Sequence, residues 1–547
     1  WWESPDGSKI LSYFPFDYVN TITQSYQLVD WLRQFEANTG FRNMLVLFGI
    51  GDHGGGPSID MIDRIEHLRS LDIYPNIKYG TTTEYLDWIK SQDLKNIHTW
   101  NDELYLEYHQ GTLTTQSQIK KYNRECETLL TNAEKFSSLS KIFGGKYDVL
   151  NIDDAWEKVM FNQFHDILPG SSIREVYVDA KEDYLDAIKT GSFVLNNALN
   201  EINQNINTSE IENGKPLVVY NTLSWDRNDL VKFNLPEGDL DQYSISDLDG
   251  NEVASQIIHA SRFTNQIIFI AENVPSLGYK TYLIKKEKSR NNNQKFAARI
   301  NMIENDYFLV KIDTSTGWVK SIYDKTNKKE ILSGEGNKLQ LLEDIPTRWD
   351  AWNLGFTGVE YPSHFVGAEL IENGPVRTVV RMTRDYLKPG VVKDFPTENF
   401  PSSFFTQDII LYSGIDRVDF KIDVDWWESH TMLKVAFPVS VMDTLATYEI
   451  PYGSIKRSTQ RNTTWEKAKY EVAAVNWADL SHDDYGVSLL NNSKYGYDIK
   501  DNVMRLSLLR SPKWPDPTAD MGNHSIEYSL FPHKGSWKDA NTVRRGY

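Results

Sequence analysis

The sequence predicts a multidomain protein of the class α/β, then α, then β: an α/β segment, a three-helix bundle and a large antiparallel β-sandwich region. Two observations support this order. A chain of 547 residues is too long for one hydrophobic core, so about three domains are expected. The spacing of hydrophobic residues alternates between strand-like and helix-like patterns to about residue 100 and is helix-like to about residue 203. From Pro216 onward hydrophobic residues recur at every second position, as in β-strands.

The first hundred residues alternate between strand-like and helix-like patterns. Strand-type runs at Met44–Phe48 and Tyr74–Tyr79 are followed by helical patterns over Ser58–Ser70 and Thr82–Ser91. Another helix is predicted near Gln24–Asn38. The alternation is typical of a parallel sheet or barrel, in which catalytic groups lie in the loops after the strands.

A glycine-rich loop, Gly49–Pro57, follows the first of these predicted strands and contains Asp52 and His53. It is not a phosphate-binding loop, because no Gly-Lys-Ser/Thr follows. Glycines let the backbone approach a ligand closely, which makes Asp52 a candidate acid or base. A capping aspartate in a flexible loop is the alternative interpretation.

A helical region follows, introduced by a strand-like stretch at Glu103–Thr112. Helices are predicted at about Thr115–Ser140, through Trp156–Phe164, and at Ser172–Asn203, and their short connections favour a bundle. The polar segment Gln204–Lys215 resembles a linker.

The second of these helices runs into Pro169–Gly170, which should end it, and Ser171–Ser172 can cap the next helix. This places His165 and Asp166 at a helix C-terminus. Such an imidazole can bind a metal or act as a general base. On this stretch alone, a histidine that only packs in a helix corner is the alternative.

The remainder of the chain reads as strands separated by turn signals, and no long helical pattern returns. The predicted segments are therefore 1–100, 101–205 and 206–547. The strand-like runs are Leu217–Tyr220, Gln266–Ile270, Tyr307–Lys311 and Val418–Ile422.

Composition narrows the range of functions. The formal net charge of -18, without a basic run, argues against a nucleic-acid partner, and no apolar run is long enough to span a membrane. A single cysteine, Cys126, excludes an intrachain disulfide and a cysteine-based zinc finger, and fits a reducing, cytoplasmic location. The 16 Trp and 29 Tyr suit sugar binding, although large β-rich proteins also bury many aromatic residues.

Taken in order, these segments resemble glycoside hydrolase family 38, the retaining α-mannosidases. The resemblance covers nearly the whole chain and rests on the number and order of its motifs. The motifs are Phe48–Pro57, Glu103–Thr112, Asn162–Ser172, Tyr220–Trp225, Trp349–Trp352, Ala446–Gly453, Lys494–Asp498 and Pro515–Asp520.

The resemblance implies a Zn²⁺ ion in a four-coordinate protein site, with His165 as one ligand. It makes Asp166 a sugar contact and Asp52 the acid/base, with His53 as a competitor for that role. Tyr18 matches a tyrosine that contacts the substrate. A retaining mechanism also requires a second carboxyl group about 5–5.5 Å from the first.

The chain departs from the family in lacking a His-x-Asp zinc-ligand pair and the aspartate nucleophile. In the family these belong to the first part of the catalytic domain, so we expect them upstream of Trp1. Residues 1–100 would then be the C-terminal portion of a (β/α) barrel-like catalytic domain. The chain is expected to be a fragment cut at both ends and inactive alone. His482-Asp483-Asp484 has the His-x-Asp form, but we interpret it as a coincidence in a polar loop.

The sequence therefore predicts a zinc-dependent retaining α-mannosidase, present as a partial chain, that hydrolyses terminal α-D-mannosyl residues of glycans or mannosides. Its partners would be α-mannosides or mannose-containing oligosaccharides. Neither nucleic acid nor membrane is expected as a partner, and the protein could also form a homo-oligomer. One alternative is a non-catalytic carbohydrate-binding or assembly protein built from the bundle and the sandwich. Another is a different glycosidase on the same scaffold.

Overall fold

The computed structural model describes residues 1–17, 25–51, 54–209, 211, 213–236, 242–259, 264–289, 296–387 and 403–547. Tyr18, Asp52 and His53 lie outside these residues. The chain forms two compact units, Trp1–Tyr105 and Leu106–Tyr547.

The first unit contains three helices at the predicted places, α1 (Ser25–Thr39), α2 (Ile59–Arg69) and α3 (Thr82–Lys90). Ser58 caps α2 by accepting a hydrogen bond from the amide of Met61, which satisfies one of the free N–H groups of the first turn. The strands β1 (Trp2–Glu3) and β2 (Lys9–Ile10) form a two-stranded antiparallel ribbon. The local signals in this segment therefore predicted its helices correctly.

The predicted strands at 44–48 and 74–79 are wrong, because neither segment is a strand in the structure. A strand needs a neighbour for its backbone hydrogen bonds, and within the described part of this unit neither segment pairs with one. Their apolar side chains instead pack against the small core of Leu28, Ile65 and Leu68. The barrel-like fold expected for the catalytic domain that contains residues 1–100 stays a prediction.

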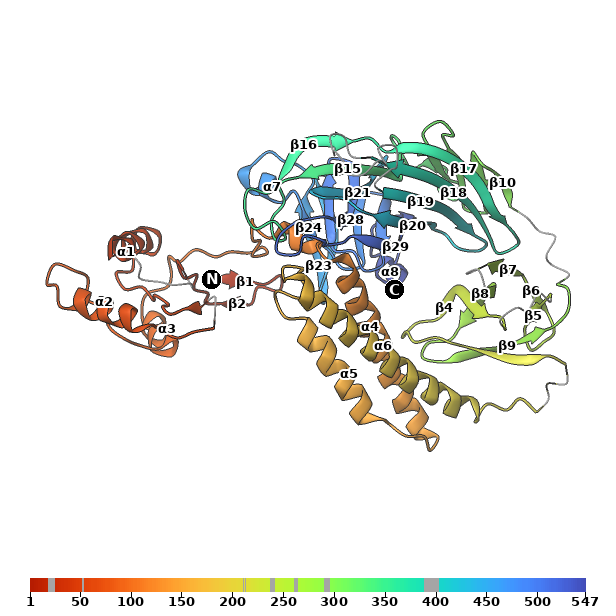
Figure 1. Ribbon diagram of the computed structural model, residues 1–547, viewed down its shortest axis with the longest axis horizontal. Helices are drawn as coiled ribbons and strands as arrows, with labels where there is room; N and C mark the ends of the chain where they lie inside the picture. Colours follow the sequence, from red (N-terminus) through yellow and green to blue (C-terminus); the bar gives the residue numbers. More distant parts are fainter. Residues whose placement is uncertain are drawn as a thin grey trace, which may run out of the picture. The chain divides into compact units, whose positions relative to one another are not determined.

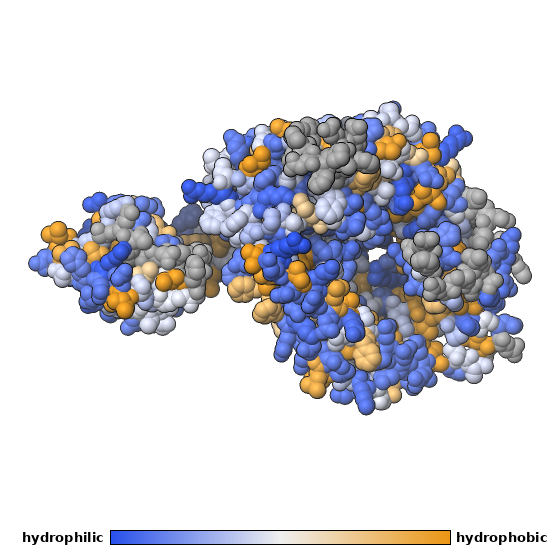
Figure 2. Space-filling view, in the orientation of Figure 1, coloured by the Kyte–Doolittle hydropathy of each residue, from blue (hydrophilic) through white to orange (hydrophobic). Residues whose placement is uncertain are grey.

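The second unit begins with a helical bundle (Figure 1) made of the 3₁₀ turn η2 (Gln110–Leu113), α4 (Ser117–Ile142), α5 (Val149–Asn162) and α6 (Arg174–Asn203). Its core joins all three long helices through Cys126, Leu130, Val159 and Tyr184. On the face that Figure 2 shows, the bundle is mostly hydrophilic, as expected for helices that bury one apolar stripe. Among the described residues, no helix combines the length and apolar character that a membrane span requires.

Three predictions for this region need correction. Glu103–Thr112 is not a strand, since its end turns into η2, where the amide of Gly111 donates to the carbonyl of Trp352. Helix α5 ends at Asn162, before Pro169 is reached. The N-cap of α6 is Ile173 without a side-chain cap, because the hydroxyls of the preceding serines bond to Asp166 instead.

A small β-sandwich follows, with sheet orders β3-β9-β5-β6 and β4-β8-β7. It encloses a core that includes Ile267, Phe269 and Tyr282. Its strands are β3 (Lys215–Tyr220), β4 (Arg227–Asn234), β5 (Ser244–Ser246), β6 (Glu252–Val253), β7 (Ser255–His259), β8 (Asn265–Val274) and β9 (Tyr279–Lys285).

The large β region contains a five-stranded, a six-stranded and a nine-stranded sheet, of orders β10-β11-β12-β13-β14, β16-β15-β21-β28-β27-β24 and β17-β18-β19-β20-β29-β26-β25-β22-β23. The two larger sheets face each other, since Phe420 of β20 contacts Phe437 of β21 at 5.3 Å between ring centroids. The predicted antiparallel β region is thus confirmed.

The elements of this region have the following bounds. They are β10 (Ala297–Arg299), β11 (Met302–Glu304), β12 (Phe308–Ile312), β13 (Val319–Asp324), β14 (Lys329–Glu330), β15 (Lys338–Asp344), β16 (Phe356–Tyr361), β17 (His364–Asn373), β18 (Arg377–Tyr386), β19 (Ser403–Tyr412), β20 (Val418–Trp426), β21 (Thr431–Pro438), β22 (Leu445–Ile450), β23 (Gly453–Ser458), α7 (Thr464–Ala468), β24 (Val472–Ala473), β25 (Trp477–His482), β26 (Tyr485–Asn491), β27 (Gly496–Lys500), β28 (Val503–Arg510), β29 (Gly522–Lys534) and α8 (Thr542–Gly546).

Candidate active site

His165 lies in the loop between α5 and α6 (residues 163–173), and its side chain is 79% exposed. Its Nε2 is 3.4 Å from Oδ2 of Asp166, whose side chain is 42% exposed. The ring of Phe164 lies beside the imidazole, at 4.3 Å between centroids. An imidazole this exposed contributes little to packing, so the structure argues against a histidine that only fills a helix corner.

The side chain of Asp166 is held by the serines that follow it. Ser171 Oγ donates to Asp166 Oδ1 at 2.8 Å, and Ser172 Oγ donates to the Asp166 carbonyl at 2.8 Å. The hydroxyl of Tyr177, from the first turn of α6, reaches the same carbonyl at 3.3 Å. These bonds occupy Oδ1 and leave Oδ2 on the side of His165.

A glycine brings the loop against the start of the bundle. Gly170 has φ +93°, and a Cβ atom added there would lie 2.5 Å from the carbonyl oxygen of Thr115. Only glycine combines this left-handed conformation with such a close backbone approach. Glycine at this position therefore lets the loop contact Thr115.

Lys120 of α4 ties the loop to the same place. Its Nζ donates to the carbonyls of Thr115 at 2.5 Å and Leu168 at 2.9 Å. Burial lowers the pKa of Lys120 to about 7, and the neighbouring Asp520 carboxylate opposes this shift. Asp520 in turn accepts hydrogen bonds from the amides of Gln116 and Ser117, so a side chain of the β region caps α4.

The β region also brings a second histidine, His109, to this end of the bundle. Its amide donates to Oδ1 of Asn353 at 3.0 Å. Burial lowers the pKa of His109, and the carboxylate of Asp166 opposes the shift. The sequence reading missed His109 because Glu103–Thr112 was predicted to be a strand.

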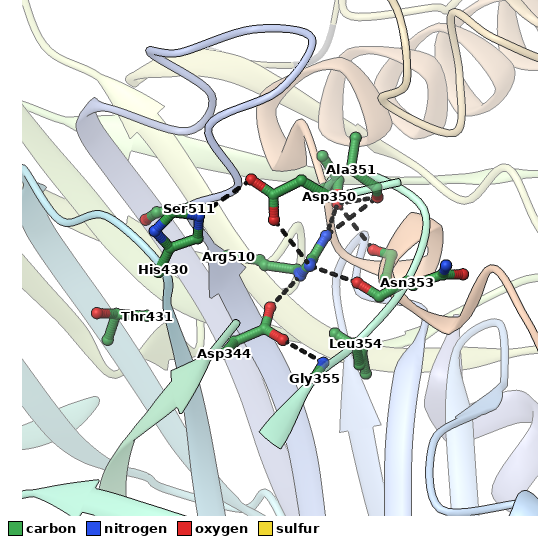
Figure 3. Close-up of polar contacts among 12 residues, drawn as sticks. Asp344, Asp350, Ala351, Asn353, Leu354, Gly355, His430, Thr431, Arg510 and Ser511 are labelled. Atoms are coloured by element: carbon green, nitrogen blue, oxygen red, sulfur yellow. Dashed lines mark hydrogen bonds and ion pairs between the residues drawn. The ribbon is translucent and has the colours of Figure 1, made fainter. Parts of the chain in front are cut away.

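Arg510, at the end of β28, fixes the loop of the β region that meets the bundle (Figure 3). The guanidinium is fully buried; its Nε bonds to Asp344 at 2.6 Å and Nη1 donates to Thr115 Oγ1 at 3.1 Å. It also donates to the Ala351 carbonyl at 3.0 Å and lies 3.9 Å from Asp350. One side chain thus joins β15, the 345–355 loop and the residues before α4.

The described residues do not by themselves fit a zinc ion. Among them, no group of three or more histidine, cysteine, aspartate or glutamate side chains could hold a metal. His165 and Asp166 supply fewer donors than a structural or catalytic zinc site uses. The roles predicted for Asp52, His53 and Tyr18 stay predictions, since those residues lie outside the described ranges.

His482, which stands in a His-x-Asp sequence, ends β25 at a surface hairpin. Its Nδ1 lies 3.0 Å from Asp443 and its Nε2 lies 3.1 Å from Asp483. The hydrogen bond to Asp443 raises the pKa of His482. Both ring nitrogens therefore have carboxylate partners at the protein surface.

The chain matches three family models in succession. The "Glycosyl hydrolases family 38 N-terminal domain" matches residues 1–103, the "Alpha mannosidase middle domain" matches residues 107–202, and the "Glycosyl hydrolases family 38 C-terminal domain" matches residues 303–518. The loop with His165 and Asp166 lies in the middle segment.

Curated relatives include Alpha-mannosidase G of Dictyostelium discoideum, 31% identical over 100% of this chain and 52% of its own length. Alpha-mannosidase 2C1 of Homo sapiens is 32% identical over 100% of this chain and 49% of its own length. The chain thus spans about half the length of these relatives. An alpha-mannosidase from Enterococcus faecalis V583 has a similar fold, with a TM-score of 0.82 and 18% identity over 100% of this chain and 70% of that one.

Proposed function

The chain belongs to glycoside hydrolase family 38, and from that premise we propose that its protein is a zinc-dependent retaining α-mannosidase. The substrates would be terminal α-D-mannosyl residues of glycans or simple mannosides. The observation that carries this proposal is the exposed His165–Asp166 pair on a firmly anchored loop, within the segment that matches the α-mannosidase middle domain.

The anchored loop suits a group that must meet a ligand in one fixed orientation. His165 would be one ligand of a zinc ion whose other donors come from outside the described residues. When bound, such an ion supplies Lewis-acid stabilisation of negative charge on oxygen. Asp166 Oδ2 would accept a hydrogen bond from a sugar hydroxyl, since Ser171 occupies only Oδ1.

Asp52 would be the acid/base, with His53 as the alternative. A general acid must keep its proton at the working pH, so its carboxyl pKa would have to be raised by its surroundings. A second carboxyl group about 5–5.5 Å away would act as nucleophile. Residues 1–547 alone would then be inactive, and the product of the complete gene would be active.

The test is to assay the product of the complete gene against a panel of aryl glycosides, and to follow the product anomer by NMR. We expect hydrolysis of the α-D-mannoside with α-mannose as the first product, and little hydrolysis of other sugars. Preference for another glycoside would support a different glycosidase. Binding of mannosides without turnover of any glycoside would support the carbohydrate-binding alternative and overturn the proposal.

A further inference from the structure

Three tryptophan rings cluster at the edge of the β region. The ring centroids of Trp349 and Trp352 are 5.8 Å apart, and that of Trp514 lies 5.7 Å from the first and 5.4 Å from the second. Trp349 is 57% exposed and Trp514 is 49% exposed. We call these three residues the tryptophan cluster; it presents indole surface to solvent instead of burying it.

The backbone that carries Trp349 is in an unusual conformation. Trp349 has φ +58°, a left-handed conformation that is costly for a bulky side chain. The carbonyl of Trp349 nevertheless accepts hydrogen bonds from the amides of Trp352 and Asn353, both at 2.9 Å. The surrounding structure thus maintains a strained turn whose side chain stays exposed.

Polar contacts to other residues hold this turn in place. Asp350, the next residue, accepts a hydrogen bond from the amide of Lys513 at 2.5 Å and lies 3.2 Å from His430. Arg510 bonds to the carbonyl of Ala351 (Figure 3). The amide of Ala351 donates to the carbonyl of Trp514 at 3.0 Å, which joins the two segments of the cluster.

The tryptophan cluster is connected to the candidate active site within the second unit. The carbonyl of Trp352 accepts the amide of Gly111, two residues after His109. Thr115, whose carbonyl is closely approached by Gly170 of the loop that carries Asp166, donates its hydroxyl to the carbonyl of Ala351 at 2.9 Å. A ligand that contacts Asp166 and extends along η2 would therefore approach these rings.

We propose that the tryptophan cluster is a binding subsite for the sugar on the leaving-group side of the scissile bond. This inference rests on the proposed function. An enzyme that removes terminal mannosyl residues meets further sugars only on the leaving-group side. The C–H face of a pyranose is apolar and packs on an exposed aromatic ring, while its hydroxyls remain in water. Two half-exposed indoles on an anchored turn offer such a surface.

The test compares two substrates with different leaving groups in the product of the complete gene. α-D-Mannosyl fluoride has no sugar as its leaving group, whereas each α-linked mannobiose has one. Trp349→Ala should raise KM for the mannobiose that is cleaved best by roughly tenfold, with little change for the fluoride. Trp349→Phe should restore part of the affinity, because a phenyl ring can also stack.

A matched control is Trp465→Ala. Trp465 lies on α7 and is 64% exposed, so this variant reports the effect of removing a surface indole elsewhere. We expect it to leave both substrates unaffected. Equal effects of Trp349→Ala on mannobiose and fluoride would overturn the subsite, because the substitution would then act on the whole protein or on the mannosyl site.

A binding measurement separates failure of the subsite from failure of the proposed function. Saturation-transfer NMR of the same protein with α-mannobiose should show contact to the leaving-group sugar, lost in Trp349→Ala and in Trp514→Ala. If no mannoside is hydrolysed and this contact is still seen, the proposed function fails and the tryptophan cluster is a sugar-binding site without a leaving-group role. If hydrolysis is normal and the contact persists in both variants, the subsite fails. Normal hydrolysis with a persistent contact is also the result expected if the tryptophan cluster only packs against another part of the protein.

Discussion

Replacing Arg510 with methionine tests whether one buried side chain holds the β region against the bundle. The substitution removes the guanidinium from beside Asp344, which is 1% exposed and, among the described residues, would keep only the amide of Gly355 as a side-chain partner, at 2.7 Å. Breaking a buried ion pair from one side typically costs 3–5 kcal/mol, because the remaining charge is left unpaired. We therefore expect Arg510→Met to lower the free energy of unfolding by about 4 kcal/mol.

Urea unfolding of residues 1–547, followed by tryptophan fluorescence and by circular dichroism, measures this effect. Arg510→Met/Asp344→Asn should recover at least half of the loss, since no uncompensated charge then remains. Arg510→Lys should fall between the wild type and Arg510→Met, because lysine keeps the charge without the planar fork that reaches Thr115 and Ala351. A loss below about 1 kcal/mol in Arg510→Met would refute the reasoning, since that is the range of an exposed pair.

Three further predictions concern the loop of residues 163–173. Gly170→Ala should lower the free energy of unfolding in urea by about 3 kcal/mol. Gly414→Ala is the control, since Gly414 also has a positive φ but an added Cβ there would have no atom within 4 Å, and it should cost about 1 kcal/mol. Equal costs would contradict a steric origin. Burial lowers the pKa of Lys120 to about 7, so from there to about 10.4 the unfolded chain binds more protons and stability rises with pH. Lys120→Met should show a smaller rise, because burial also lowers the pKa of Lys494 to about 7 and that residue still contributes; parallel pH profiles of wild type and variant would contradict the role of Lys120. Asp166→Asn should lower kcat/KM for α-mannosides in the complete gene product at least tenfold while urea unfolding is nearly unchanged; unaltered kinetics would exclude a sugar contact.

The helices could be predicted from the sequence because their signals are local. The apolar period lies within one segment, and α2 begins directly after Ser58, where the predicted helix starts. Strands depend on a partner, so the apolar run at 44–48 was wrongly predicted to be a strand. The end of α5 was also misplaced, because its last turn closes at Asn162, before the proline could act.

The candidate site was only partly predictable, for a related reason. His165 and Asp166 were found because their neighbours form a recognisable motif. Their support comes from residues far along the chain, since Asp520 caps α4 and Arg510 binds Thr115. The residue pattern within one segment cannot predict contacts between residues that lie far apart in the sequence. His109 was missed for the same reason, since its backbone amide binds Asn353 of the β region.

Zinc content measured together with activity tests the central claim most directly. The complete gene product and its His165→Ala variant would be purified without added metal, and zinc per chain and α-mannoside hydrolysis would be measured in the same samples. His482→Ala is the matched control, since that histidine is also exposed beside a carboxylate but lies on a surface hairpin. We predict bound zinc and hydrolysis in the wild type and the control, and loss of both in His165→Ala. Full hydrolysis without zinc, or unchanged zinc and activity in His165→Ala, would contradict the account.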